Sequence, residues 1–183
     1  MTALNTSRMV VNFFLFQVGW FSCVLGAAHG VPWIGTAAVA GVVTWHLANA
    51  AHAAQEAKLI AIALLIGALW DSLLIGLGWV AYPAGTLVAG AAPHWILALW
   101  ALFATALNVS MRWLKQRLLY AMMLGAICGP LSYWGALRLG AVQFIEPLRI
   151  VIALALGWGL IMPILMLVSR RYDGIAAPER ALA

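Results

Sequence analysis

Six apolar stretches, each close to the length of a membrane-spanning helix, divide this chain. A helix that rises 1.5 Å per residue needs about 20 residues to cross roughly 30 Å of hydrocarbon. Proline or glycine interrupts three of the connections between the stretches, as expected where a helix must end. We therefore predict an all-α fold, a single polytopic transmembrane domain over residues 1–183. Its six helices are expected at residues 9–28, 34–51, 59–80, 95–112, 117–137 and 149–169.

The composition supports a membrane protein and argues against a soluble one. Hydrophobic residues make up 66% of the chain and charged residues 8%, whereas about 25% of an ordinary soluble domain is charged. The net charge is +5, but the basic residues are scattered at helix ends and form no dense patch, which argues against nucleic acid as a partner. The first apolar stretch is longer than the ~7–15 residues of a signal-peptide core, so we expect a retained helix.

The distribution of lysine and arginine predicts the orientation. Cytoplasmic segments of membrane proteins carry an excess of basic residues. With the N-terminus inside, the outer segments hold only Arg138 and Arg149, and both termini are expected in the cytoplasm. The inner segments would then hold Arg8, Lys58, Arg112, Lys115, Arg117, Arg170, Arg171 and Arg180.

Asp71 is the most costly residue in the predicted bundle, because a carboxylate near the middle of a spanning helix loses several kcal/mol of solvation. Gly67 and Gly78 share its face of the third helix, which points the carboxylate toward other helices. By depth, Gln17 and Trp20 of the first helix are its expected neighbours. Two interpretations stay open: a hydrogen-bonded node that joins helices, or a residue that binds a ligand, carries a proton or acts in catalysis.

A second polar layer is expected nearer the cytoplasmic side. By helical rise, His46 lies about 7 Å from that side, and Asn12 and Asn108 lie about 5 Å from it. Amide and imidazole groups at one depth often hydrogen-bond between helices. This layer is interpreted either as such a structural contact or as part of a functional site.

The fifth helix contains a break with hydroxyl groups beside it. Gly125 and Gly129 form a small-residue face that lets another helix approach closely. Pro130 interrupts the backbone hydrogen bonds, and Ser132 and Tyr133 follow it directly. Such a break lines a cavity in some membrane proteins and serves packing alone in others. Small-residue faces of this kind also allow an oligomer or a second membrane protein as partner.

Tryptophan is unusually frequent, with ten residues in the chain. Those at helix ends are expected to lie at the membrane surface, where the amphipathic ring is favoured: Trp33, Trp79, Trp95 and Trp113. The others are expected to pack inside the bundle or to line a cavity: Trp20, Trp45, Trp70, Trp100, Trp134 and Trp158.

The sequence predicts no metal site and no cofactor. It contains neither CxxC nor HExxH. Its four histidines fall at differing depths, which disfavours a metal cluster: His29, His46, His52 and His94. Cys23 and Cys128 both lie in apolar stretches and are interpreted as small hydrophobic residues.

Polar and aromatic residues recur in a fixed order inside the apolar stretches. They read NFFLFQVGWF at 12–21, LWD at 69–71, LWALFA at 99–104 and GPLSY at 129–133. In these segments the chain resembles DUF2878, a family of uncharacterised bacterial inner-membrane proteins, over most of its length. The resemblance implies a location in the bacterial inner membrane. Members tend to be encoded near enzymes that resemble cyclopropane fatty acid synthases, which implies a task connected with membrane lipids.

Three functions are compatible with these features. The first is an accessory protein that binds a membrane lipid or another apolar small molecule in a cavity open to the bilayer, bounded by Trp20, Trp70 and Tyr133. The second is a transporter of small solutes or its substrate-binding subunit, with a cavity open to water on one side and a helix interrupted at Pro130. The third is an intramembrane enzyme, in which Asp71 would meet a base and a nucleophile within about 3 Å.

Overall fold

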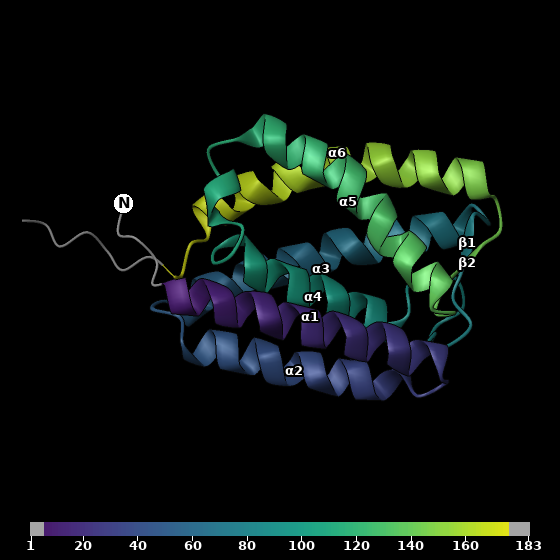
Figure 1. Ribbon diagram of the computed structural model, residues 1–183, viewed down its shortest axis with the longest axis horizontal. Coiled ribbons are helices and arrows are strands. Elements are labelled where there is room, and N and C mark those ends of the chain that lie inside the picture. The colour runs from purple at the N-terminus through teal and green to yellow at the C-terminus, as the bar shows by residue number, and fades with distance from the viewer. Residues whose placement is uncertain (1–5, 176–183) are drawn as a thin grey trace, which may run out of the picture.

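The computed structural model describes residues 6–175, which form six α-helices joined by short connections (Figure 1). The helices are α1 (Thr6–Ala28), α2 (Pro32–Ala48), α3 (Ala53–Gly76), α4 (His94–Leu107), α5 (Leu118–Arg138) and α6 (Pro147–Arg171). A 3-10 turn, η1 (Arg112–Leu114), follows α4. The predicted all-α class and the six helices are confirmed over the described residues. Arg180, one of the residues used to predict the orientation, lies outside them.

Four of the helices are long and apolar enough to cross a membrane: α1, α3, α5 and α6. The other two, α2 with 17 residues and α4 with 14, are shorter. Helix α4 is buried along almost its whole length, because it packs against α1, α2, α3 and α6. A helix that is apolar on all sides and covered by neighbours belongs to the core of the bundle.

Successive helices run in alternating directions, so the bundle has two distinct ends (Figure 1). The start of α1 and the end of α6 lie together at one end, which we name the terminal end. The opposite end, named the strand end, carries two short antiparallel strands, β1 (Val80–Ala81) and β2 (Gln143–Phe144). These strands pair the segment after α3 with the segment before α6.

Helices α1 and α5 enclose an open wedge. Helix α1 packs on α2 and α4, and α5 packs on α6, but α1 and α5 do not pack along each other. Figure 1 shows them converging toward the strand end and diverging toward the terminal end. Where they converge, the Nε1 of Trp20 donates a hydrogen bond to the Oγ of Ser132 at 3.1 Å.

Glycines allow the close contact between α5 and α6. A Cβ atom on Gly125 would lie 2.2 Å from the backbone oxygen of Trp158, and one on Gly129 would lie 2.4 Å from the Trp158 ring. The predicted small-residue face of the fifth helix is therefore confirmed. The predicted break at Pro130 is not, because α5 runs without interruption from Leu118 to Arg138. A Cβ on Gly67 of α3 would likewise meet the Trp100 ring at 2.2 Å.

The third helix differs from its prediction at both ends. It begins at Ala53, six residues before the expected 59, and ends at Gly76 rather than at 80. Asp71 therefore lies close to the strand end of α3 and not near its middle. Gly78 has left the helix and has a φ of +70° in the turn that follows, so it does not share the face of Asp71.

The tryptophans also depart from the expected pattern. Trp33 and Trp113 are exposed, as surface anchors would be, but Trp95 is fully buried. The segment between β1 and α4 folds back over Trp95, whose Nε1 donates to the backbone oxygen of Ala84 at 3.0 Å. Trp134, expected inside the bundle, has 53% of its surface exposed.

Candidate functional site

Asp71 lies at the centre of a buried hydrogen-bond cluster near the strand end. Its side chain is 0% exposed. The hydroxyls of Tyr82 and Tyr133 donate to Oδ1 at 2.8 and 2.7 Å. The Nε1 of Trp100 donates to Oδ2 at 2.8 Å. The carboxylate thus joins α3 to α4, to α5 and to the segment that follows β1.

These partners differ from those that the depth argument predicted. Trp20 donates its hydrogen bond to Ser132, and neither Trp20 nor Gln17 is among the residues that hydrogen-bond to Asp71. The depth argument placed Asp71 several residues too far from the end of α3, and Trp20 instead shares a cavity wall with Trp100 and Tyr133, which do bond to the carboxylate. Tyr133 was expected near a cavity, and the structure brings it directly to the carboxylate.

The segment after β1 positions Tyr82. Pairing of Val80 with Phe144 and of Ala81 with Gln143 fixes the backbone just before it. The backbone N–H of Ala92 donates to the Oγ of Ser72 at 3.0 Å and ties the segment back to α3. Burial, and then the charge of Asp71, raise the pKa of Tyr82 well above its usual range, so its hydroxyl keeps its proton at neutral pH.

A small cavity of about 70 Å³, the aromatic cavity, lies beside this cluster. Trp100 and Tyr133 belong both to its wall and to the Asp71 cluster, with their polar atoms on the carboxylate. More than half of the wall is aromatic, and the main polar side chain in it besides these is Ser132. The lining residues are Phe16, Trp20, Val24, Trp95, Ile96, Leu99, Trp100, Phe103, Ser132, Tyr133, Ala136, Val142 and Trp158.

A larger opening of about 450 Å³ follows the wedge between α1 and α5, and we name it the lateral groove. Helix α6 contributes Trp158 and Met162 to it, and Met111 and Leu114 lie toward the terminal end. Its α1 wall includes Gln17, and its α5 wall includes Leu124, Cys128 and Leu131. The groove shares part of its wall with the aromatic cavity, namely Phe16, Trp20, Phe103, Ser132 and Trp158.

Trp70 was expected beside Trp20 and Tyr133 in the wall of a cavity. It lines neither the groove nor the aromatic cavity. Its ring lies instead against Gly157 of α6, where a Cβ atom would approach it to 2.2 Å. The sequence placed it one position before Asp71, but successive helical residues point about 100° apart, so the two side chains face different neighbours.

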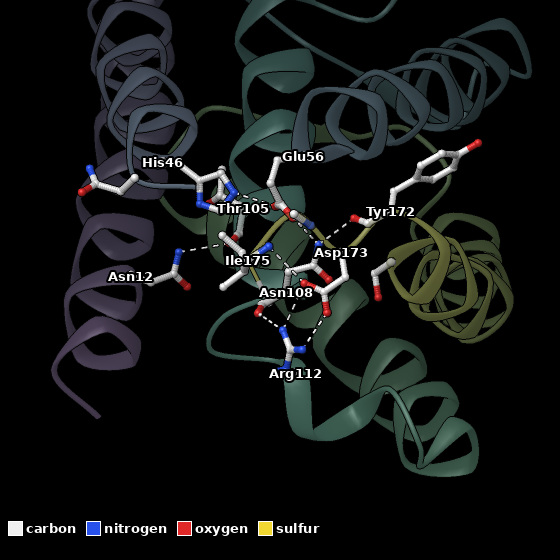
Figure 2. Close-up of polar contacts among 12 residues, drawn as sticks. Asn12, His46, Glu56, Thr105, Asn108, Arg112, Tyr172, Asp173 and Ile175 are labelled. Atoms are coloured by element: carbon white, nitrogen blue, oxygen red, sulfur yellow. Dashed lines mark hydrogen bonds and ion pairs between the residues drawn. The ribbon is translucent and has the colours of Figure 1, made fainter. Parts of the chain in front are cut away.

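The terminal end holds a second buried cluster, centred on Glu56 (Figure 2). Its carboxylate is 0% exposed. The Nε2 of His46 lies 2.7 Å from Oε2. Oε1 accepts from the Nδ2 of Asn108 at 2.6 Å and from the backbone N–H of Gly174 at 2.7 Å. Sequence reasoning missed Glu56, because it assigned residues 52–58 to a connection.

Asn12 belongs to a neighbouring part of this layer. Its Nδ2 donates to the backbone oxygen of Thr105 at 3.2 Å, and its Oδ1 accepts from the Oγ of Ser110 at 2.8 Å. Asn12 is thus linked to α4, while His46 and Asn108 meet through Glu56. The three predicted residues lie at one end of the bundle, as Figure 2 shows, but without direct bonds between them.

The segment after α6 closes the terminal end. Asp173 forms ion pairs with Arg112 and with Lys115, each at 2.7 Å. Burial lowers the pKa of Lys115, and the hydrogen bond and charge of Asp173 partly counteract that effect. The backbone oxygen of Gly174 accepts from the N–H of His52 at 2.9 Å. These contacts hold residues 172–175 against the ends of α3 and α4.

Neither cluster has the composition of a metal site. Among residues 6–175, no group of three or more His, Cys, Asp or Glu side chains could hold a metal ion. The Asp71 cluster instead combines one acid with neutral donors, and the Glu56 cluster combines one acid with an imidazole and an amide.

The apolar helices and their exposed side chains define the class of the protein. Large hydrophobic residues on the outer faces of the spanning helices are widely exposed, among them Phe14 (62%), Leu69 (66%) and Leu156 (66%). Lipid, unlike water, makes such a surface favourable. Together with four candidate spans, this identifies a multi-pass membrane protein.

Residues 9–164 match the family described as "Protein of unknown function (DUF2878)", and the chain belongs to this family. No curated protein and no solved structure matches it.

Proposed function

We propose that this protein binds a membrane lipid, or another apolar molecule with a chain of similar width, in the lateral groove. The observation that carries the proposal is the groove of about 450 Å³ between α1 and α5. Ligand sites are typically concave and mostly apolar, with few polar groups that set orientation. Here Gln17 and Ser132 are the polar side chains in a wall otherwise formed by aliphatic and aromatic residues and Cys128.

The groove would lie in the cytoplasmic half of the bacterial inner membrane. We propose that both termini are cytoplasmic, because eight of the basic residues fall on that side under this orientation. The shared location of the start of α1 and the end of α6 supports such an arrangement. Since α1 and α5 diverge toward this end, a lipid chain could enter sideways from the inner leaflet.

Binding has more support than transport or catalysis. The transport interpretation predicts a helix interrupted at Pro130, whereas α5 is continuous through this residue. A proton-transfer role would need a base or a nucleophile near Asp71, whereas its hydrogen-bond partners in the described chain are two tyrosines and a tryptophan. The family resemblance implies a task connected with lipid-modifying enzymes. Such a task fits a protein that binds a lipid and presents it to an enzyme.

Substitution inside the groove tests the proposal. Cys128 is exposed and lines the groove, so Cys128→Trp would fill it. Ile127→Trp is the matched control, because Ile127 is 57% exposed on the same helix but outside the groove wall. Native mass spectrometry of protein purified in mild detergent should show retained lipid for the wild type and for Ile127→Trp, and much less for Cys128→Trp. Equal retention by all three proteins would refute a specific groove site.

A further inference from the structure

We propose that the aromatic cavity takes the cationic head of an amphiphile, a primary alkylammonium group, whose hydrocarbon chain lies in the lateral groove. The inference rests on the proposed function and adds the chemistry of the head group. It is carried by the charge balance around Asp71, the composition of the cavity wall and the continuity between cavity and groove.

The first step concerns the charge of Asp71. Trp100 Nε1 can only donate, and the tyrosine hydroxyls both point their hydrogen bonds at Oδ1. All three groups are neutral, and a buried acid among neutral groups keeps its proton unless an opposite charge lies close by. The ion pairs formed among residues 6–175 join other side chains, and none involves Asp71. A cation close by would stabilise the ionised carboxylate relative to the neutral acid, and the carboxylate would in turn favour the cation.

The second step concerns the wall of the cavity. Trp100 and Tyr133 hold Asp71 with their polar atoms while their rings line the cavity. A cation in the cavity would therefore be separated from the carboxylate by these two side chains, in an environment with weak dielectric screening. Aromatic rings attract cations directly, and Trp20 and Phe16 add further rings to this wall. The hydroxyl oxygen of Ser132 offers an acceptor for an ammonium N–H.

The third step concerns size and continuity. The aromatic cavity, at about 70 Å³, is much smaller than the lateral groove, at about 450 Å³. The smaller space suits a compact head group, and the hydrocarbon chain would lie in the larger groove. The shared wall at Trp20 and Ser132 connects the cavity to the groove, so head and chain of one molecule can occupy both. A fatty acid brings no positive charge and would not favour ionisation of Asp71.

Two probes of equal chain length test the head-group preference. Dodecylamine, which is protonated at pH 7, and 1-dodecanol differ mainly in charge. Quenching of tryptophan fluorescence in lipid nanodiscs should show dodecylamine binding at least about tenfold more tightly to the wild type, a difference of about 1.4 kcal/mol. Asp71→Asn should remove this preference, and Cys128→Trp should weaken both probes. Equal affinities for the two probes would overturn the alkylammonium inference alone, whereas binding of neither would overturn the proposed function.

A lysine introduced into the cavity wall provides a second test. This test remains valid if Asp71→Asn lowers stability, because each comparison is made between two variants in the same background. Ala136 lines the cavity and is 6% exposed. Ala136→Lys places a cation there, and Ala136→Met is a control of similar length without charge. With Asp71 present, the lysine variant should melt at or above the temperature of the methionine variant. When Asp71→Asn is added to both variants, the lysine variant should melt clearly below the methionine variant. A lysine penalty of equal size in both backgrounds would contradict the inference.

Discussion

Tyr133 of α5 donates its hydroxyl hydrogen to Asp71 of α3 at 2.7 Å and so connects two helices that do not pack along each other. Trp100 of α4 donates a hydrogen bond to the other carboxylate oxygen at 2.8 Å. The carboxylate of Asp71 therefore connects α4, the core helix, to α5, which forms one wall of the groove. We therefore expect substitutions of Asp71 to shift Tyr133 and so to change the shape of the groove.

Removal of the Tyr133 hydroxyl should destabilise the bundle while leaving the ring in place. Tyr133→Phe deprives the buried carboxylate of one of its three donors, at an expected cost of about 1–2 kcal/mol. Tyr120→Phe on the same helix is the control, since Tyr120 is 55% exposed. Thermal unfolding in detergent should show a lower melting temperature for Tyr133→Phe only. Identical melting temperatures would argue that the hydroxyl contributes nothing to the fold.

Glu56 should be among the most important polar residues for stability. Glu56→Ala removes the acceptor for His46, for Asn108 and for the backbone of Gly174. Unpaired buried polar groups cost about 1–3 kcal/mol each, so a loss of about 3 kcal/mol or more is expected. Unfolding in SDS, followed by tryptophan fluorescence, measures it. The exposed Lys58→Ala, two positions along α3, should remain within about 0.5 kcal/mol of the wild type.

The pairing of Asp173 with Lys115 should make stability depend on pH. Because burial lowers the pKa of Lys115, the protonated amine disfavours folding below its folded pKa. That penalty disappears as the pH rises toward about 10.4, the value of an unfolded lysine. Asp173→Asn removes the partner that compensates the charge, and should cost about 2 kcal/mol at pH 7 and less at pH 10. Melting temperatures of both proteins at the two pH values test this. A difference that is constant or grows with pH would contradict the account.

Labelling of single cysteines should establish the orientation. In a variant without Cys23 and Cys128, Leu87→Cys should react with a membrane-impermeant maleimide from the periplasmic side, because Leu87 is 68% exposed in the segment between β1 and α4. Lys58→Cys, at the terminal end, should react only after the membrane is opened. The reverse pattern would place both termini outside.

The helical architecture could be predicted because hydrocarbon length dominates it. Six helices form where six apolar stretches occur, although α2 and α4 are shorter than a membrane requires. Helix α4 illustrates the limit of this reasoning. Length and hydropathy describe it as one more span, but its burial by four neighbours depends on contacts between distant segments.

The candidate sites were predicted in part. Asp71, Asn12, His46, Asn108 and Tyr133 were selected because polar groups are costly in apolar helices. Their partners could not be predicted in the same way. Glu56 stands in the polar run 55–58, which resembles an exposed connection, and its burial is explained only by His46 and Asn108 reaching it from other helices.

Tyr82 shows the same difficulty at the other end of the molecule. It lies in a connection rich in glycine and proline, where no periodic pattern predicts which way a side chain points. Only the pairing of β1 with β2 brings it to Asp71. Trp95 was assigned to the membrane surface for a similar reason, since the covering segment 82–93 could not be anticipated.

A structure determined in lipid nanodiscs would test the central claim, that the lateral groove is a binding site, most directly. We predict elongated density between α1 and α5 that passes Cys128 and Trp158 and ends near Trp20 and Ser132, at the entrance to the aromatic cavity. Density that surrounds all outer helix faces equally, with α1 and α5 closed against each other, would contradict it.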